Sequence, residues 1–393
     1  MSEIPQDANE PASAPAQVQP APAEQPAEVH APAAQKPVRV AWVAGKETID
    51  RFGNTLQPMA VGLMDELVEL VVLCPAGCET RGLPCPPLEV IQYPRLNWPR
   101  LHPRRLEALA AEVSSRKIEL VHALDVSAAA LARRLAELAG VSYLLTAYSL
   151  GDGRRLGRLD SRGAGVLAAS TAIQKDLLEH HVATAQKVHL LRPGVYQARH
   201  ANCFSELGRR AAVIAGGDLG SFSAFDAVLE CFARPHVRKY DCVFFIIGSG
   251  KAERRLRARS EKLGLRSDLT FVDRPPASRM PELLKGADIY ISPSPSRSLN
   301  MEALLAMAAG VPVLAARSDA ADFLQEGKTA MLFQAGNPAD LTGKLTSLLD
   351  DRASARSLAE SALSYLRENH SPARMVVWLA SIYRQAAEMR PPQ

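Results

Sequence analysis

The stretch that decides the fold reads Ser292-Pro-Ser-Pro-Ser-Arg-Ser-Leu-Asn-Met-Glu-Ala-Leu-Leu-Ala-Met-Ala-Ala-Gly-Val-Pro-Val313. It has the pattern of a strand end, a polar loop, an apolar helix and a second strand. Two strands joined through a helix normally pair in parallel, because the helix carries the chain back across the sheet. The stretch therefore predicts one unit of a parallel α/β sheet.

The rest of the chain repeats this alternation of strands and helices. The strand candidates are 38–43, 67–73, 118–123 and 142–147 in the first half, and 210–215, 241–247, 269–272, 288–292 and 311–315 in the second. Helical patterns lie between them, at 104–117, at 128–138 and from residue 52 onward, where Asn54 or Thr55 is the expected cap. We predict an α/β protein with two Rossmann-like domains facing a cleft.

Length and composition agree with this prediction. The chain has 393 residues, which exceeds the usual size of one hydrophobic core. Apolar residues make up 47 % and charged residues 22 %, as in ordinary globular proteins. No run approaches the ~20 apolar residues that a membrane-spanning helix needs. A water-soluble protein is therefore expected.

Residues 1–37 differ in kind from the rest. Proline recurs there among Ala, Gln and Glu, which predicts a disordered tail. The tail lacks the basic start and apolar middle of a secretory signal, so a cytoplasmic location is expected. It holds five acidic residues and no Lys or Arg before Lys36, so the net charge of +4 leaves about +9 on the remainder. That charge favours anionic partners, and phosphate-bearing donors, membrane surfaces and nucleic acid all qualify.

A metal site is not expected from the cysteines. Cys74, Cys78 and Cys85 are close in sequence, but they lack paired C-x-x-C spacing and a fourth ligand nearby.

Several segments, taken in order, resemble the retaining GT-B glycosyltransferases, which use nucleotide sugars. The segments are 121–123, 166–170, 188–194, 245–250, 286–294 and 310–313. The resemblance covers nearly everything after the tail. It implies an acceptor-side domain at 38–198, a nucleotide-sugar domain at 199–370, and a helix at 371–393 that crosses back to the first domain. It implies no metal and no cofactor, with the nucleotide sugar as substrate.

Four positions depart from the family pattern. Arg297 and Leu305 stand where the family has two glutamates. Asp218 stands where the family has an arginine after the first strand of the second domain, and Tyr148 stands where it has a histidine in the first domain. The scaffold resembles the family, while its donor site has changed chemistry. Glu302 lies three residues before Leu305 on one helix face, so it could replace the lost glutamate. An ordinary glutamate at a helix start is the alternative.

The expected site follows from these matches. Glycines near strand ends allow close approach of the backbone to phosphate, and the amides at the start of the helix suit an anion, although an ordinary capped helix would look the same. We expect Tyr148 and Glu302 to serve catalysis, and Gly53, Gly216, Gly217, Gly248, Arg297, Ser298, Leu299, Asn300 and Glu302 to bind the donor.

Two functions fit the sequence. The first is transfer of a sugar from a UDP-, GDP- or ADP-linked donor to an unknown acceptor, for example in the synthesis of a cell-surface polysaccharide or glycolipid. The second is a catalytically inactive homologue that acts as a binding or scaffolding protein. Arg95, Arg100, Arg104 and Arg105, with Trp98 among them, leave open a peripheral contact with the inner face of a membrane. No nucleic-acid partner is expected.

Overall fold

The structure is a computed structural model that describes residues 36–78, 88–94, 103–206 and 208–389. The predictions for the tail before Lys36, and those for Cys85, Arg95, Trp98 and Arg100, lie outside the described residues.

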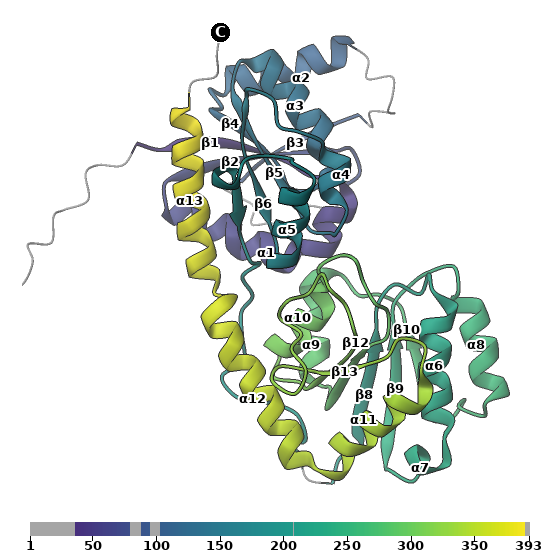
Figure 1. The fold of residues 1–393 in the computed structure, drawn as a ribbon. Coiled ribbons are helices and arrows are strands. Elements are labelled where there is room, and N and C mark those ends of the chain that lie inside the picture. Colours follow the sequence, from purple (N-terminus) through teal and green to yellow (C-terminus); the bar gives the residue numbers. More distant parts are fainter. Residues whose placement is uncertain (1–35, 79–87, 95–102, 207, 390–393) are drawn as a thin grey trace, which may run out of the picture. The chain divides into compact units, whose positions relative to one another are not determined.

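The first half of the described chain builds one parallel sheet with the strand order β3-β2-β1-β4-β5-β6-β7 (Figure 1). The strands are β1 (Val38–Val43), β2 (Val68–Pro75), β3 (Glu89–Tyr93), β4 (Leu120–Ala123), β5 (Ser142–Ala147), β6 (Gly163–Ala168) and β7 (Val188–Leu190). The helices are α1 (Lys46–Asp65), α2 (Pro103–Ser115), α3 (Ala129–Ala139), α4 (Asp152–Leu156) and α5 (Thr171–Glu179), with short 3₁₀ turns at Val126–Ala128 and Ala185–Lys187.

The second half builds another parallel sheet, with the order β10-β9-β8-β11-β12-β13. Its strands are β8 (Ala211–Gly216), β9 (Cys242–Ile247), β10 (Leu269–Val272), β11 (Ile289–Ser292), β12 (Val313–Ala316) and β13 (Met331–Phe333). The helices are α6 (Phe222–Ala233), α7 (Pro235–Arg238), α8 (Glu253–Lys262), α9 (Met280–Lys285) after a 3₁₀ turn at Ala277–Arg279, α10 (Met301–Ala308), α11 (Pro338–Asp350), α12 (Arg352–Asn369) and α13 (Pro372–Glu388).

The two sheets confirm the predicted fold class of two Rossmann-like domains. In each sheet the strand order reverses beside the first strand, between β1 and β4 and between β8 and β11. Ligands of open parallel sheets bind outside the carboxyl ends of the strands at such a point. The finer domain boundaries stay a prediction.

The predicted start of α1 was wrong. The helix begins at Lys46, and Gly45, with φ −82° and ψ 167°, is its extended N-cap residue. Asn54 and Thr55 therefore lie inside the helix. The Asn54 Nδ2 group donates to the carbonyl oxygen of Ala277 at 2.6 Å. The side chain that was expected to cap the helix therefore makes a tertiary contact.

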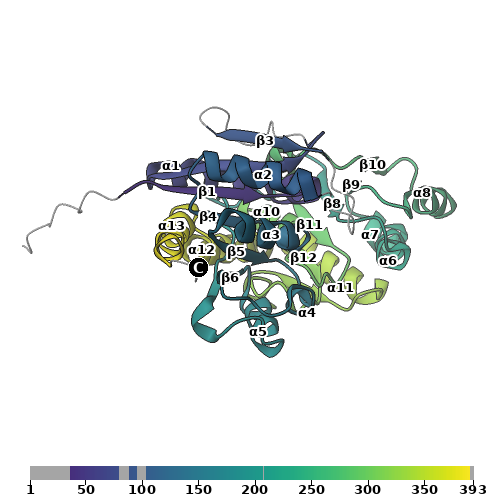
Figure 2. The same cartoon turned by 90° about the horizontal axis from the view of Figure 1, so that it is seen from above.

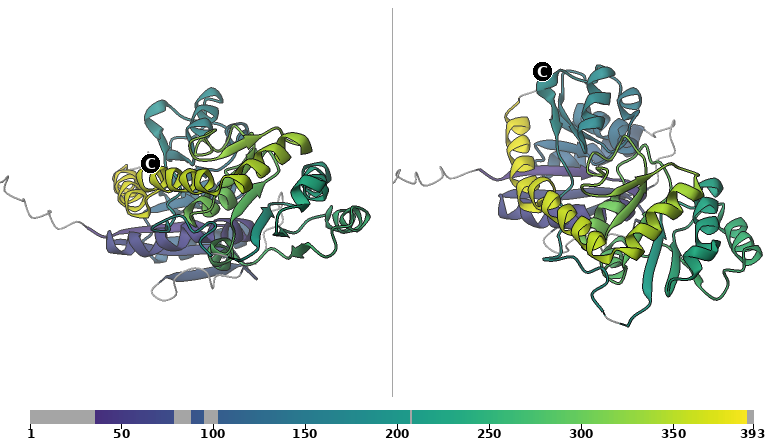
Figure 3. Two further views of the ribbon diagram at one scale, coloured as in Figure 1. Left: turned by 90° about the horizontal axis from the view of Figure 1, so that it is seen from below. Right: turned by 60° about the horizontal axis from the view of Figure 1, so that its bottom comes forward.

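The last helix packs on the first sheet. Helices α12 and α13 follow one another with a bend at His370 and Ser371 (Figures 1 and 3). Helix α13 contacts α1, β1, β4 and β5, and it lies beside β1 and β4 in Figure 2. Close packing of α1 against α13 needs Gly62, because a Cβ atom there would lie 2.7 Å from Val376 Cγ2.

A buried chain of hydrogen bonds joins α13 to three strands. The Trp42 Nε1–H group, which can only donate, donates to Tyr383 Oη at 2.8 Å. The Tyr383 hydroxyl is hydrogen-bonded to His122 Nδ1 at 2.6 Å. His122 Nε2 is hydrogen-bonded to Thr146 Oγ1 at 2.7 Å. Both ring nitrogens of His122 thus have a hydroxyl partner, and burial lowers its pKa to about 3.

The α1–α13 contact predicts opposite effects for two Gly→Ala substitutions within helices. Gly343→Ala in α11 meets no atom within 4 Å and should raise the free energy of unfolding by about 1 kcal/mol through helix propensity. Gly62→Ala gains the same propensity but overpacks against Val376, which costs about 1–3 kcal/mol. We expect it to be less stable than the parent in urea unfolding. Equal stabilisation by both substitutions would show that α1 and α13 do not pack as described.

Burial of neutral His122 predicts acid sensitivity. Below about pH 6.5 the unfolded chain takes up a proton on this side chain, and the native protein does so only near the lowered pKa. The free energy of unfolding should therefore fall as the pH drops below about 6.5, by up to roughly 1 kcal/mol per pH unit.

His122→Gln should show a shallower fall in urea titrations at pH 7.5, 6 and 5. His370, whose pKa burial lowers to about 4, contributes in the same direction in both proteins. Identical pH dependence of parent and variant would contradict the assignment.

Candidate functional site

The predicted site residues of the second domain lie at the carboxyl ends of neighbouring parallel strands. Gly216 ends β8 and Gly217 follows it, Gly248 follows β9, and the segment 297–300 joins β11 to α10. Glu302 is the second residue of α10. The fold therefore brings these segments to one edge of the sheet.

The glycines let the loops after β8 and β9 pack on each other. A Cβ atom on Gly216 would lie 2.5 Å from Tyr290 Oη, and one on Gly248 would lie 2.2 Å from the carbonyl oxygen of Gly217. The Leu219 amide donates to the Ser249 carbonyl oxygen at 3.1 Å. The structure thus gives these glycines a packing role, and their contact with a donor stays a prediction.

The Glu302 carboxylate is held by two partners. The Tyr290 hydroxyl donates to Oε2 at 3.2 Å, and Arg274 Nη2 lies 2.6 Å from Oε1. The Glu302 side chain is only 12 % exposed. Burial and the negative charge of Glu302 raise the pKa of the Tyr290 hydroxyl, so it remains a donor at neutral pH. Glu302 is therefore a fixed acceptor at the start of α10.

Asn300 sets the direction of α10 and hence of Glu302. Its Oδ1 atom accepts from the Ala303 amide at 3.1 Å, which caps the helix. Its Nδ2 group donates to Ser292 Oγ at 2.6 Å, which ties the cap to the end of β11.

Sequence reasoning missed two cations at this site. Arg274 follows β10, and Arg51 comes from α1 in the first domain. Arg51 Nη2 donates to the carbonyl oxygen of Leu299 at 3.3 Å. Burial and the charge of Arg274 lower the pKa of Arg51, while Glu302 and Asp218 oppose that effect. The position of Arg274 at the end of a predicted strand was the signal that could have found it.

A short antiparallel bridge joins Ser149 of the first domain to Ser298 of the second. The Leu299 amide donates to the Tyr148 carbonyl oxygen at 2.7 Å, and the Leu150 amide donates to the Arg297 carbonyl oxygen at 2.7 Å. The Ser298 amide donates to Ser296 Oγ at 3.0 Å. Two of the three amides predicted to bind an anion thus donate to protein acceptors here.

The remaining predicted site residues do not share one environment; they are Tyr148, Gly53 and Arg297. The Tyr148 ring stacks on Phe52, with centroids 3.9 Å apart. Burial, with a smaller effect of Asp125, raises the pKa of its hydroxyl, so it suits hydrogen bonding better than proton transfer. Gly53 lies inside α1 and not in the loop after β1. Arg297 is exposed, and its Nη2 lies 3.6 Å from the position of a Cβ on Gly151.

Neither a cluster of potential metal ligands nor a membrane-spanning helix occurs among the described residues. Within these ranges no group of three or more His, Cys, Asp and Glu side chains is placed to hold a metal ion. None of the helices within the same ranges is both long and apolar enough to cross a bilayer.

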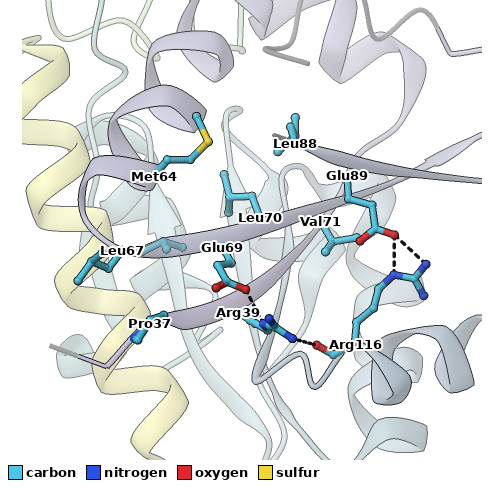
Figure 4. A pocket seen from close by; sticks show the side chains of 11 residues that line it. Pro37, Arg39, Met64, Leu67, Glu69, Leu70, Val71, Leu88, Glu89 and Arg116 are labelled. Carbon is cyan, nitrogen blue, oxygen red and sulfur yellow. Dashed lines mark hydrogen bonds and ion pairs between the residues drawn. The ribbon is translucent and has the colours of Figure 1, made fainter. Parts of the chain in front are cut away.

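A pocket of about 460 Å³ lies at the other end of the first sheet, where β1, β2 and β3 begin (Figure 4). Met64, Leu70 and Leu88 are among its apolar lining residues. Its charged side chains pair with each other or with neighbours, since Arg39 binds Glu69 and Arg116 binds Glu89. The pocket is therefore separate from the candidate site.

Comparison with known proteins places the second domain among sugar-transferring families. Residues 212–351 match the family model described as glycosyl transferases group 1. A D-inositol 3-phosphate glycosyltransferase of Corynebacterium glutamicum is 28 % identical over 246 residues, covering 57 % of this chain and 58 % of that protein. The sulfoquinovosyl transferase SQD2 of Arabidopsis thaliana is 26 % identical, covering 50 % and 40 %. The chain thus matches about half the length of these relatives.

Solved structures share the fold. A glycosyltransferase from Rickettsia africae superposes with a TM-score of 0.74 at 15 % identity, and the match covers 90 % of this chain and 100 % of that chain. Anabaena Alr3699/HepE in complex with UDP-glucose superposes with a TM-score of 0.71 at 14 % identity, covering 87 % and 98 %.

Contact between Gly216 and Tyr290 predicts a coupled pair of substitutions. Gly216→Ala should lower the free energy of unfolding by about 1–3 kcal/mol, because the buried Tyr290 ring cannot move away. Tyr290→Phe alone loses the hydrogen bond to the Glu302 carboxylate, worth about 1.5–3 kcal/mol. The double variant should be more stable than the sum of the single effects, since it removes the nearest clashing atom. Additive effects in urea unfolding would contradict this packing.

Proposed function

We propose that the chain is a glycosyltransferase of GT-B fold that binds a nucleotide sugar and transfers the sugar to an acceptor, which the match of its second domain to glycosyl transferases group 1 supports. The observation that carries the proposal is the Glu302 carboxylate, held between Arg274 and Tyr290 at the carboxyl ends of the second sheet. A fixed carboxylate at that position is a suitable acceptor for ribose hydroxyls.

The donor class is part of the proposal. Anabaena Alr3699/HepE, which shares the fold, is known in complex with UDP-glucose, and this supports a UDP-linked donor. The acceptor in this proposal is a hydroxyl-bearing molecule. Arg104 and Arg105 are exposed at the start of α2, which supports a peripheral contact with an anionic membrane surface.

Transfer requires stabilisation of a charged leaving group. The bond between the anomeric carbon and the diphosphate oxygen breaks, and its electron pair leaves with the nucleoside diphosphate. The acceptor oxygen forms the new bond to the anomeric carbon, and its proton passes to a phosphate oxygen of the leaving nucleoside diphosphate. Cations beside the diphosphate lower the barrier, because charge develops there in the transition state. Tyr148 contributes a neutral hydrogen-bond donor beside the sugar in this proposal.

A binding or scaffolding role without catalysis is the second candidate. It is favoured by the bridge between Ser149 and Ser298, in which the Leu299 amide already has an acceptor. The glutamate positions of the family pattern, occupied here by Arg297 and Leu305, favour it too.

Calorimetry with UDP-, GDP- and ADP-glucose tests the proposal. We expect saturable binding of one donor, at least tenfold weaker in Glu302→Ala because the ribose loses its acceptor. Glu253→Ala is the matched control, since this glutamate pairs with Arg257 on the outer helix α8. Release of the nucleoside diphosphate in the presence of a cell lipid extract then separates transfer from binding. Failure of all three donors to bind would refute both binding and transfer of these nucleotide sugars.

A further inference from the structure

We infer that Arg51 and Arg274 together form the diphosphate subsite, with Glu302 as the resting partner of Arg274. This inference rests on the proposed function and deepens it. It assigns the phosphate cations to α1 and to the segment after β10, in place of the turn after β8 and the loop before α10.

The geometry places both guanidinium groups beside the start of α10. Arg274 lies 2.6 Å from the Glu302 carboxylate, and Arg51 contacts the Leu299 carbonyl oxygen at 3.3 Å. The Arg274 side chain is 38 % exposed, so it can turn toward an incoming ligand. Arg51 reaches the same place from the first domain and is half-buried.

Of the two guanidinium groups, that of Arg274 has a carboxylate in salt-bridge contact, and among the described residues that of Arg51 has none. Within the described ranges the hydrogen-bond acceptor of Arg51 is the neutral carbonyl oxygen of Leu299. Burial and the like charge of Arg274 lower the pKa of Arg51, and the charges of Glu302, Asp218 and Asp152 oppose them. Glu302 neutralises one guanidinium group. Asp218 is exposed, and it turns its carboxylate to the Gly220 amide at 2.9 Å. A diphosphate would supply negative charge to both guanidinium groups. A guanidinium group can bind phosphate with two parallel N–H···O hydrogen bonds.

Binding would then exchange the hydrogen-bond partners of Arg274 and Glu302. Arg274 turns from Glu302 to a phosphate oxygen, and the carboxylate becomes free to accept a ribose hydroxyl. Arg51 gives up a weak contact with Leu299 for a charged one. Because Arg51 belongs to the first domain and Arg274 to the second, the ligand joins both domains through its phosphates.

The other cation near this loop is less well placed. Arg297, which the sequence offered for this role, is exposed and lies beside Gly151 in the loop after β5. Its backbone is already part of the bridge to Leu150. Its side chain therefore faces the first domain and not Glu302.

The test uses inorganic pyrophosphate, which has the phosphates of the donor but no ribose. In calorimetry with the full chain, Arg51→Gln and Arg274→Gln should each weaken pyrophosphate binding at least tenfold. Glu302→Gln should strengthen it several-fold, because Arg274 loses its competing partner. Arg51→Lys should recover part of the affinity, which separates a charge effect from misfolding. Arg134→Gln, an exposed arginine paired with Glu137 on α3, is the neutral control.

The possible outcomes test the diphosphate subsite and the proposed function separately. If the parent binds a donor but neither arginine substitution weakens pyrophosphate binding, the subsite assignment is wrong while the proposed function stands. If Arg297→Gln alone abolishes pyrophosphate binding, the phosphate cation is Arg297. If pyrophosphate does not bind the parent at millimolar concentration, Arg51 and Arg274 form no phosphate site. Weaker pyrophosphate binding in Glu302→Gln would refute the exchange of partners.

Discussion

The Glu302 carboxylate is the charge around which the candidate site is arranged. A carboxylate that is mostly withdrawn from water must be paired and hydrogen-bonded, because an unpaired buried charge is strongly destabilising. Arg274 supplies the charge and Tyr290 the hydrogen bond. The Tyr290 ring fits only because Gly216 has no side chain. One charge thus fixes the relative positions of β8, β11, α10 and the segment after β10.

The sequence predicted most of the fold because its central strands are continuous apolar runs. Strands β1 and β5 match their predicted bounds, since nearly all their residues are buried in packed layers and no other pattern competes. Strand β10 also matches its predicted bounds, although it is an edge strand with one buried residue. Strands β3 and β13 were missed for the opposite reason. β3 is an edge strand without a fully buried residue, and β13 has three residues, so neither gives a periodic signal.

The site was only partly predictable, because its chemistry comes from contacts between distant segments. Glu302 and the glycines after β8 and β9 could be named, since each lies at a fixed distance from a recognisable strand end. Arg51 could not, because nothing in the sequence of α1 indicates that its side chain meets the loop before α10. The amides at 298 and 299 were predicted to bind an anion, which stays a prediction. In the structure they donate to Ser296 and Tyr148, and these acceptors depend on how the loop folds and on the first domain.

The bridge between the domains has a smaller effect on function than the pair of arginines. Opening the bridge costs two backbone hydrogen bonds, each worth about 0.5–1.5 kcal/mol net. A ligand of micromolar affinity contributes about 8 kcal/mol, so the bridge cannot by itself keep a donor out. Charge has the larger effect, since catalysis of transfer requires cations at the leaving diphosphate whatever the loop does. The ability of Arg51 and Arg274 to hold a diphosphate, and not the closed bridge, therefore separates a working transferase from a protein that kept only the fold.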